Sequence, residues 1–164
     1  MPTGRLIELA LVVALLFPSS AFAAQSAELD GAVVKTVETA LGAAQSGNVA
    51  ELSAQYLPDC TFVDEFAPFY WSGPNAINAY FTSAAQMYKD TKMTGTKVAH
   101  GAPKYVYVGT DSAYVAVPLR VGAEVNGKPY KATGTLTFTL TKISATWKIA
   151  SQSWTKETEN INPY

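Results

Sequence analysis

Residues 133–141 read TGTLTFTLT, and this stretch decides the architecture. Every second residue is threonine, and the residues between are apolar or glycine. Side chains of a β-strand point alternately to its two faces, so the pattern predicts a strand with one threonyl face and one apolar face. An apolar sheet face needs a second layer to cover it.

The strands around this one follow from turn signals. Asn126-Gly127 precedes it and predicts a type I′ hairpin turn, which needs positive φ at both central residues. Gly109-Thr110-Asp111 marks an earlier hairpin between Lys104–Val108 and Ala113–Val121. A last strand is expected over about residues 146–155. The chain from about residue 94 therefore predicts four antiparallel strands in a meander.

The first half of the chain predicts three helices and one short strand. The first helix has an apolar face and stops at Gly47. The second starts at an Asn48 cap with Glu51 three positions on and should end at Pro58. A strand over residues 60–64 follows, and Gly73-Pro74 should start the third helix. The expected faces are Val33, Val37, Leu41 and Ala44; then Val49, Leu52 and Tyr56; then Ile77, Tyr80, Phe81, Ala84 and Tyr88.

This order of elements predicts an α+β domain, with three N-terminal helices packed on a curled, mostly antiparallel sheet. A sheet that curls around its helices leaves a cone-shaped cavity, and such cavities are default sites for small ligands. Length agrees, because 164 residues are enough for one domain.

The first 23 residues are interpreted as a secretory signal peptide. Arg5 is followed by a nine-residue apolar run over residues 9–17, and Ala21-Phe22-Ala23 fits the small-x-small cleavage rule. The run is shorter than the ~20 residues that span a bilayer. We therefore expect a single domain over residues 24–164 that is exported, either periplasmic or secreted, with no membrane attachment after cleavage. An uncleaved anchor is the alternative.

Composition excludes several functional classes. Charged residues are 15% and hydrophobic residues 48% of the chain, with a net charge of −1 and no basic run, so nucleic acid is not an expected partner. The only histidine is His100 and the only cysteine Cys60, without a metal-ligand spacing. No nucleotide-binding motif occurs. Neither a metal nor a cofactor is predicted, and Cys60 is expected to be a buried, inert thiol.

Three segments resemble the NTF2-like superfamily, in particular its SnoaL-like and ketosteroid isomerase-like members. They are residues 46–64, the Ser72-Gly73-Pro74-Asn75-Ala76-Ile77 helix start, and Thr137–Trp154 with Trp147-Lys148-Ile149. The resemblance covers about residues 31–157 and implies a cone-shaped NTF2-like barrel. Fold does not by itself imply activity.

The resemblance also implies roles for individual residues. Asp64 falls where the isomerases keep an aspartate base, Tyr56 matches a tyrosine of their hydrogen-bond network, and Trp154 matches an aromatic wall. The family's oxyanion tyrosine would fall near Ala40 and its partner aspartate near Thr135–Thr137. A base without these donors argues against that particular reaction, since the oxyanion hole usually lowers the barrier more than the base does.

Asp64 is the best single candidate for a functional group. Neighbouring aromatic residues would exclude water from its carboxylate and raise its pKa, as a general acid or base requires. The alternative is an aspartate that caps a loop or faces water. The aromatic segment 66–71 could line a pocket mouth or pack into the core. Arg120 is expected to lie at the sheet surface, or else to pair with an acid such as Asp64.

Three functions remain open from sequence. The first is binding of a small apolar or aromatic molecule, with walls formed by Phe62, Trp71, Phe81, Phe138 and Trp154. The second is a cofactor-independent isomerase, lyase or cyclase, in which Asp64 moves a proton and Tyr56 orients it. The third is an association module that uses the outer sheet face. The threonyl face and the resemblance also predict a homodimer.

Overall fold

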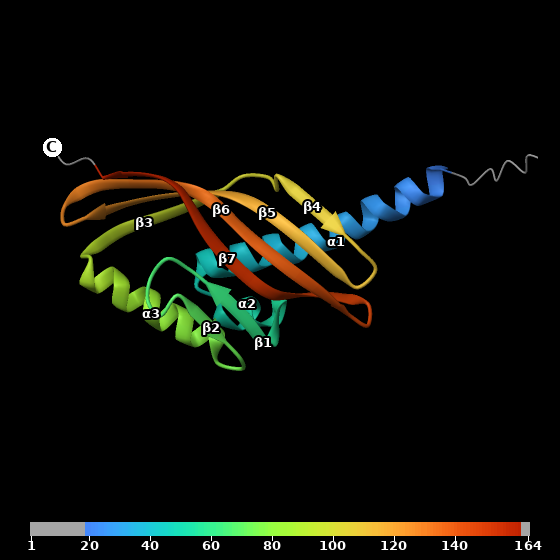
Figure 1. Ribbon diagram of the computed structural model, residues 1–164, viewed down its shortest axis with the longest axis horizontal. Coiled ribbons are helices and arrows are strands. Elements are labelled where there is room, and N and C mark those ends of the chain that lie inside the picture. The colour runs from blue at the N-terminus through green and yellow to red at the C-terminus, as the bar shows by residue number, and fades with distance from the viewer. Residues whose placement is uncertain (1–18, 162–164) are drawn as a thin grey trace, which may run out of the picture.

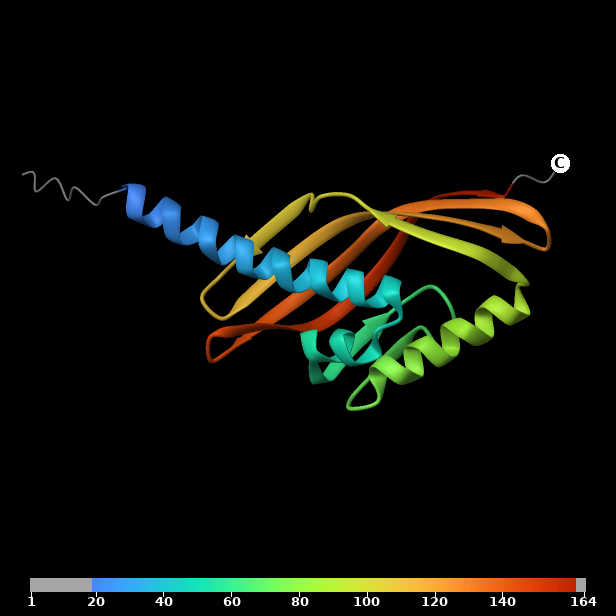
Figure 2. The ribbon, with the colours of Figure 1, turned by 180° about the vertical axis from the view of Figure 1, so that it is seen from behind.

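A strongly curled sheet wraps around three helices in the computed structural model, which describes residues 19–161 (Figure 1, Figure 2). The helices are α1 (Ser19–Ser46), α2 (Val49–Gln55) and α3 (Ala76–Asp90). The strands are β1 (Tyr56–Val63), β2 (Tyr70–Ser72), β3 (Met93–His100), β4 (Tyr105–Val108), β5 (Ser112–Val125), β6 (Lys128–Ile143) and β7 (Thr146–Ile161). The predicted α+β class is confirmed.

The sheet has the order β2-β1-β7-β6-β5-β3, and β4 also pairs with β5. The expected meander is present as β4-β5-β6-β7, all antiparallel. β3 pairs with the second half of β5 and β4 with the first, so these two strands share one edge. β1 lies parallel to β7, a long-range pairing that local patterns did not predict. This parallel pairing places the end of β1 next to residues 151–153 of β7.

The alternation in β6 sorts its side chains as predicted. Phe138 and Leu140 are 0% and 1% exposed, whereas Thr139 on the other face is exposed. At the turn before this strand, Asn126 has φ 52° and Gly127 has φ 74°, as the type I′ prediction requires. The inward face of β6 packs with α1 and β5 in one continuous hydrophobic core.

The helix boundaries agree at α1 and differ at the other two. α1 ends at Ser46 before Gly47, whose φ is 69°. The Asn48 side chain accepts a hydrogen bond from the Glu51 amide at 3.2 Å and caps α2. α2 then ends at Gln55, and Tyr56 belongs to β1 because it pairs with Ile149 of β7. The predicted end at Pro58 is therefore wrong.

α3 begins later than expected. Its cap is Asn75 and its first residue Ala76, while Gly73 has φ 85° and lies in the preceding turn. Two further expectations about the apolar faces are corrected: Val49 is 48% exposed, and Ala43 rather than Ala44 is buried on α1. Cys60 is 1% exposed and free, as predicted, and burial raises the pKa of its thiol.

Residues 1–18 of the predicted signal peptide lie outside the described residues, and α1 already includes the expected cleavage point at Ala23. Within residues 19–161, no helix is both long and apolar enough to cross a membrane.

Candidate functional site

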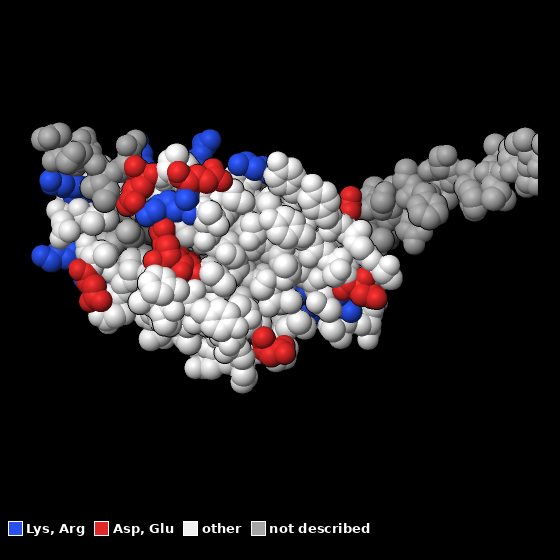
Figure 3. Space-filling view, viewed as in Figure 1, with Lys and Arg blue, Asp and Glu red and all other residues white. Residues whose placement is uncertain are grey.

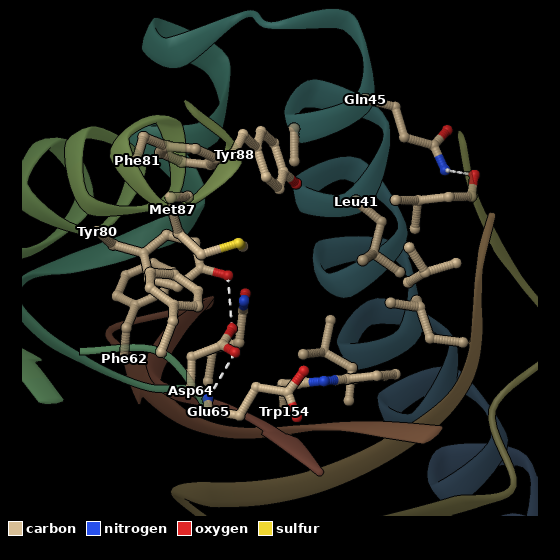
Figure 4. Close-up of a pocket in the computed structure, with 18 of the residues that line it drawn as sticks. Leu41, Gln45, Phe62, Asp64, Glu65, Tyr80, Phe81, Met87, Tyr88 and Trp154 are labelled. Atoms are coloured by element: carbon tan, nitrogen blue, oxygen red, sulfur yellow. Dashed lines mark hydrogen bonds between the residues drawn. The ribbon is translucent and has the colours of Figure 1, made fainter. Parts of the chain in front are cut away.

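A cavity of about 290 Å³ lies between the inner face of the sheet and the facing sides of α1 and α3 (Figure 4). Its lining is mostly apolar and aromatic. Leu41 of α1 lies across the cavity from Phe81, Met87 and Tyr88 of α3, and Phe62 and Trp154 complete the wall on the sheet side. The sheet therefore curls far enough to leave space that the helices do not fill.

Asp64 brings a carboxylate into this apolar space. It follows Val63, the last residue of β1, and shares the inner face with Phe62 because alternate residues of a strand point the same way. Its Oδ2 accepts a hydrogen bond from the Tyr80 hydroxyl at 2.7 Å, and its Oδ1 accepts one from the Glu65 backbone amide at 2.7 Å (Figure 4). Both oxygens are thus oriented by the protein.

Burial raises the pKa of the Asp64 carboxyl, because a charged group loses solvation in the cavity. The hydrogen bonds from Tyr80 and from the Glu65 amide work in the opposite direction and are the smaller effects. Burial and the neighbouring carboxylate raise the pKa of the Tyr80 phenol, so it stays protonated and acts as the donor. The pair is therefore a carboxyl whose pKa is raised by burial and which accepts a hydrogen bond from a neutral phenol.

Tyr80 is itself held by an aromatic cluster. Its ring stacks on Phe62 at 4.8 Å between centroids and meets the edge of Trp71 at 5.1 Å. Phe66 lies 5.5 Å away, and Tyr56 stacks on the other side of Phe62 at 5.2 Å. Such pairs favour particular ring arrangements. This packing stabilises the position in which the Tyr80 hydroxyl donates to Asp64.

A second polar pair lies on the sheet side of the cavity. The hydroxyl of Tyr56 donates a hydrogen bond to Oε1 of Gln152, and both residues line the cavity. Burial raises the pKa of the Tyr56 phenol above its ordinary value, so this hydroxyl keeps its proton. Gln152 of β7 pairs with Phe62 of β1, and Asp64 is the next residue after Phe62 that faces the cavity. Gln152 and Asp64 are therefore near neighbours in the cavity wall.

The structure puts five of the seven predicted site residues around the cavity. They are Asp64, Tyr56, Phe62, Phe81 and Trp154. Trp71 and Phe138 do not line it, and their predicted place in its wall is wrong. Trp71 packs behind Tyr80 and donates from Nε1 to the Ser83 hydroxyl at 3.1 Å. Phe138 is 0% exposed because α1 covers that part of the sheet.

Sequence reasoning missed Tyr80 and Gln152 as site residues. The signal for Tyr80 was present, because it shares a helical face with Ala84 and Tyr88, but that face was assigned to packing. Gln152 alternates with Trp154 on β7, so the inward placement of one implied the other. Nothing local marked either as a partner of Asp64 or Tyr56.

The aromatic segment after β1 divides between the two predicted roles. Phe66 is turned inward and lines the cavity, and Trp71 is buried in the core. Phe69 and Tyr70 are each 57% exposed and have no part in the cavity. Of these four aromatic side chains, only that of Phe66 therefore lines the cavity.

The charges around the cavity are acidic. Asp64 and Glu65 are its charged lining residues, and Glu65 forms an ion pair with Lys156 at 3.2 Å. Arg120 is exposed and does not line the cavity, so the suggested pair with Asp64 does not form. His100 is exposed at the end of β3. In the described part of the chain, no group of three or more His, Cys, Asp or Glu could hold a metal ion.

The outer face of the sheet is the second notable surface. Figure 3 shows a broad area without charged residues over the sheet, with charges gathered toward the ends of the molecule. Tyr105 and Tyr107 are 56% and 63% exposed and stack at 6.2 Å. On the threonyl face of β6, Thr139 lies across from Tyr114 of β5, and the Thr139 and Ser151 hydroxyls are 2.6 Å apart.

Comparison with known proteins identifies the family. Residues 33–154 match the model of the SnoaL-like domain, and the chain belongs to this family. No curated protein sequence matches it. The fold, with three helices on a curled, mostly antiparallel sheet, is that of NTF2-like proteins.

Several solved structures share this fold at low sequence identity. A ketosteroid isomerase-like protein from Erwinia carotovora atroseptica has a TM-score of 0.62 and 19% identity, over 80% of this chain and 97% of its own. An NTF2-like protein with a cystatin-like fold from Novosphingobium aromaticivorans has a TM-score of 0.64 and 16% identity, over 91% and 92%. The hexachlorocyclohexane dehydrochlorinase LinA-type3 from Novosphingobium barchaimii has a TM-score of 0.66 and 9% identity, over 90% and 95%.

Proposed function

We propose that this protein binds a small, neutral, largely apolar molecule in its cavity, with the Asp64 carboxyl as the polar anchor. The observation that carries the proposal is the Asp64–Tyr80 pair at 2.7 Å inside a mostly apolar and aromatic lining. Burying a carboxylate costs free energy, which hydrogen bonds such as those from Tyr80 and the Glu65 amide offset. A site that keeps one at a cavity wall is a candidate functional site.

The size of the cavity narrows the ligand. An apolar cavity of ~150 Å³ holds one benzene molecule. The volume here, about 290 Å³, therefore suits a compound of roughly two rings. Because the cavity opens to solvent, a larger ligand could extend outward from it.

The charge of the lining residues also limits the charge that the ligand can have. A carboxylate or phosphate ligand would meet Asp64 and Glu65 without a lining cation to pair with. Leaving an anion unpaired at a desolvated site is costly. Neutral compounds are therefore favoured over anionic ones.

Blocking the cavity from α3 tests this proposal. Ala84 lines the cavity, and Ala85 beside it is exposed and does not. We expect binding of 2-tetralone, a neutral two-ring ketone, to be detected by NMR titration and to weaken at least tenfold in Ala84→Phe. The added ring occupies about half of the ligand space. Ala85→Phe should bind as the wild type does, and equal binding in both variants would refute the cavity as the site.

A second candidate function is proton transfer by Asp64, as in an isomerase or lyase. It is supported by the raised pKa of this carboxyl and by the neutral Tyr80 phenol that orients it. In such a reaction a positioned carboxylate acts as the general base that removes a proton from carbon. The names of a ketosteroid isomerase-like protein and a dehydrochlorinase among the structures of the same fold are compatible with this class.

Hydrogen–deuterium exchange at carbon measures this step directly. In deuterated buffer, Asp64 would take a proton from the carbon beside the carbonyl of 2-tetralone, and the bonding pair would move into an enolate. The exchanged carboxyl would then return a deuteron to carbon. We expect Asp64→Asn to slow exchange by about 10²-fold or more. Asp59→Asn, at an exposed position of β1, is the matched control, and equal rates in both variants would remove Asp64 from the mechanism.

Two further proposals concern the state of the protein in the cell. Export is supported by the apolar run and the cleavage pattern of residues 1–23, and intact-mass measurement of the protein from its native host would test it. A homodimer, or an association module, is supported by the uncharged outer face with Tyr105 and Tyr107. We expect Tyr107→Lys to shift a dimer toward monomer in light scattering.

A further inference from the structure

Gln152 is a polar residue of the cavity with one half of its amide unused. It lies on the inner face of β7, where its neighbour Trp154 also lines the cavity. Its Oε1 accepts the hydrogen bond from Tyr56. Its amide nitrogen makes no hydrogen bond to any other residue between 19 and 161, so two N–H donors are left for a ligand or water.

The Tyr56 phenol determines which end of the amide is left free. This phenol is 4% exposed and keeps its proton, so its hydroxyl must donate to an acceptor. The acceptor it has is the amide oxygen. If the amide rotated by 180°, the phenol oxygen could accept from the amide nitrogen, but the phenol's own O–H would be left without an acceptor. Stacking of the Tyr56 ring on Phe62 at 5.2 Å keeps the hydroxyl in place.

We propose that Gln152 is a specificity residue that donates a hydrogen bond to a neutral carbonyl oxygen of the ligand, and that Tyr56 is the positioning residue that orients its amide. The inference rests on the proposed small-molecule function and deepens it by naming the ligand class, a neutral ketone or aldehyde. It also differs from the donors implied by family resemblance. Ala40 brings only a methyl group to the cavity, and the Thr135 hydroxyl bonds Glu157 at 2.6 Å on the opposite face.

The register of the sheet places the Gln152 amide and the Asp64 carboxylate close enough for one carbonyl ligand to contact both. Gln152 pairs with Phe62. Asp64 lies two residues after Phe62, just beyond the end of β1, and lines the same cavity. Adjacent strands are ~4.8 Å apart, and residues two apart on a strand are separated by ~6.6 Å. A small ketone can therefore bring its oxygen to the amide while a neighbouring carbon faces the carboxylate.

A matched pair of probes isolates this hydrogen bond. Tetralin and 2-tetralone share a two-ring skeleton, and only 2-tetralone has a carbonyl oxygen. We expect the ratio of their dissociation constants to favour 2-tetralone about tenfold more in the wild type than in Gln152→Met, which is the effect of one hydrogen bond to a desolvated group. The ratio is used because the difference in hydration of the free probes cancels. Gln86→Met, at an exposed position of α3, should leave it unchanged.

A second variant guards against loss of folding. Gln152→Met leaves the buried Tyr56 hydroxyl without its acceptor, which could destabilise the core. At a pH at which its carboxyl is ionised, Gln152→Glu retains an acceptor for Tyr56 and removes the donor toward the ligand, so it should also abolish the preference for 2-tetralone. In Tyr56→Phe the amide is present but free to rotate, and we expect an intermediate preference.

Infrared spectroscopy of the bound ketone gives a readout that a merely structural role would not change. The carbonyl stretch of 2-tetralone should lie at lower frequency in the wild type than in Gln152→Glu, because a donated hydrogen bond weakens the C=O bond. An unchanged stretch together with an unchanged probe ratio would overturn the role of Gln152 and leave the cavity as the binding site. If neither probe binds the wild type, the proposed function fails, and this inference fails with it.

Discussion

Gly134 of β6 is packed against Trp154, which lines the cavity, so a larger residue at this position should disturb both the sheet and the site. A Cβ atom at this position would lie 2.2 Å from the Thr155 carbonyl oxygen and 2.6 Å from Cη2 of Trp154. The contact with the carbonyl must lengthen to at least 3.0 Å before it is physically reasonable. Gly134→Ala therefore forces β6 and β7 apart where Trp154 forms part of the site.

The expected cost can be worked out from this geometry. Overpacking by one methyl group costs about 1–3 kcal/mol, and disturbing a neighbouring ladder hydrogen bond adds about 1 kcal/mol. Replacing a strand glycine returns about 0.5–1 kcal/mol of chain entropy. The net destabilisation is about 1–3.5 kcal/mol, with a centre at about 2 kcal/mol, which is a large part of the ~5–15 kcal/mol that holds a domain folded.

Urea unfolding of a matched pair of variants tests this estimate. Gly122 lies in the neighbouring strand β5, and a Cβ there would meet nothing within 4 Å. We expect Gly122→Ala to be neutral or slightly stabilising, and Gly134→Ala to lower the urea midpoint by about 1 M or more. Equal free energies of unfolding for the two variants would refute the packing described between β6 and Trp154. Weaker binding of 2-tetralone by Gly134→Ala should accompany the loss of stability.

Three further predictions concern the core, a helix cap and the buried carboxyl. Phe138→Ala should destabilise by about 3–5 kcal/mol, because the ring is fully buried under α1; a loss below about 1 kcal/mol on urea unfolding would contradict this burial. Asn48→Ala should cost about 1 kcal/mol in the same assay, since its side chain caps α2, and an unchanged midpoint would argue against the cap. Asp64 has a pKa raised in the folded state, so its contribution to stability is full below its unfolded pKa and is lost as pH rises through the folded value. The stability of the wild type relative to Asp64→Asn should therefore fall with rising pH in this range, and a rise would show that the carboxyl is stabilised by its surroundings.

Local patterns were sufficient for much of the fold. The turn at Asn126-Gly127 depends on the φ angles of two residues, and the alternation in β6 depends on strand geometry alone. Neither requires knowledge of distant residues. Both were predicted correctly for this reason, as were the end of α1 at Gly47 and the Asn48 cap.

Long-range pairing decided what local patterns could not. Val49, Leu52 and Tyr56 have helical spacing, yet Tyr56 lies in a strand because it pairs with Ile149 of β7, far along the chain. The same parallel pairing brings Gln152 beside Phe62 and so forms half of the site. No periodicity within either segment contains this information.

The sequence was sufficient to single out Asp64, but not to tell which aromatic residues line the cavity. Asp64 was found from its place at a strand end among aromatic residues. Which aromatic residues reach the cavity depends on where the helices cover the sheet: α1 covers Phe138, while Trp71 lies behind Tyr80. The partner of Asp64 could be chosen only once the position of α3 over β1 was known.

The most direct test of an Asp64 carboxyl that faces the ligand space is an NMR titration of its carboxyl carbon, assigned with Asp64→Asn, with and without saturating tetralin. We expect a pKa above the ordinary ~3.9 in the free protein, and a further rise when tetralin displaces water from the cavity. A pKa at or below the ordinary value, or one that tetralin leaves unchanged, would show that Asp64 does not face the ligand and would contradict the proposed site.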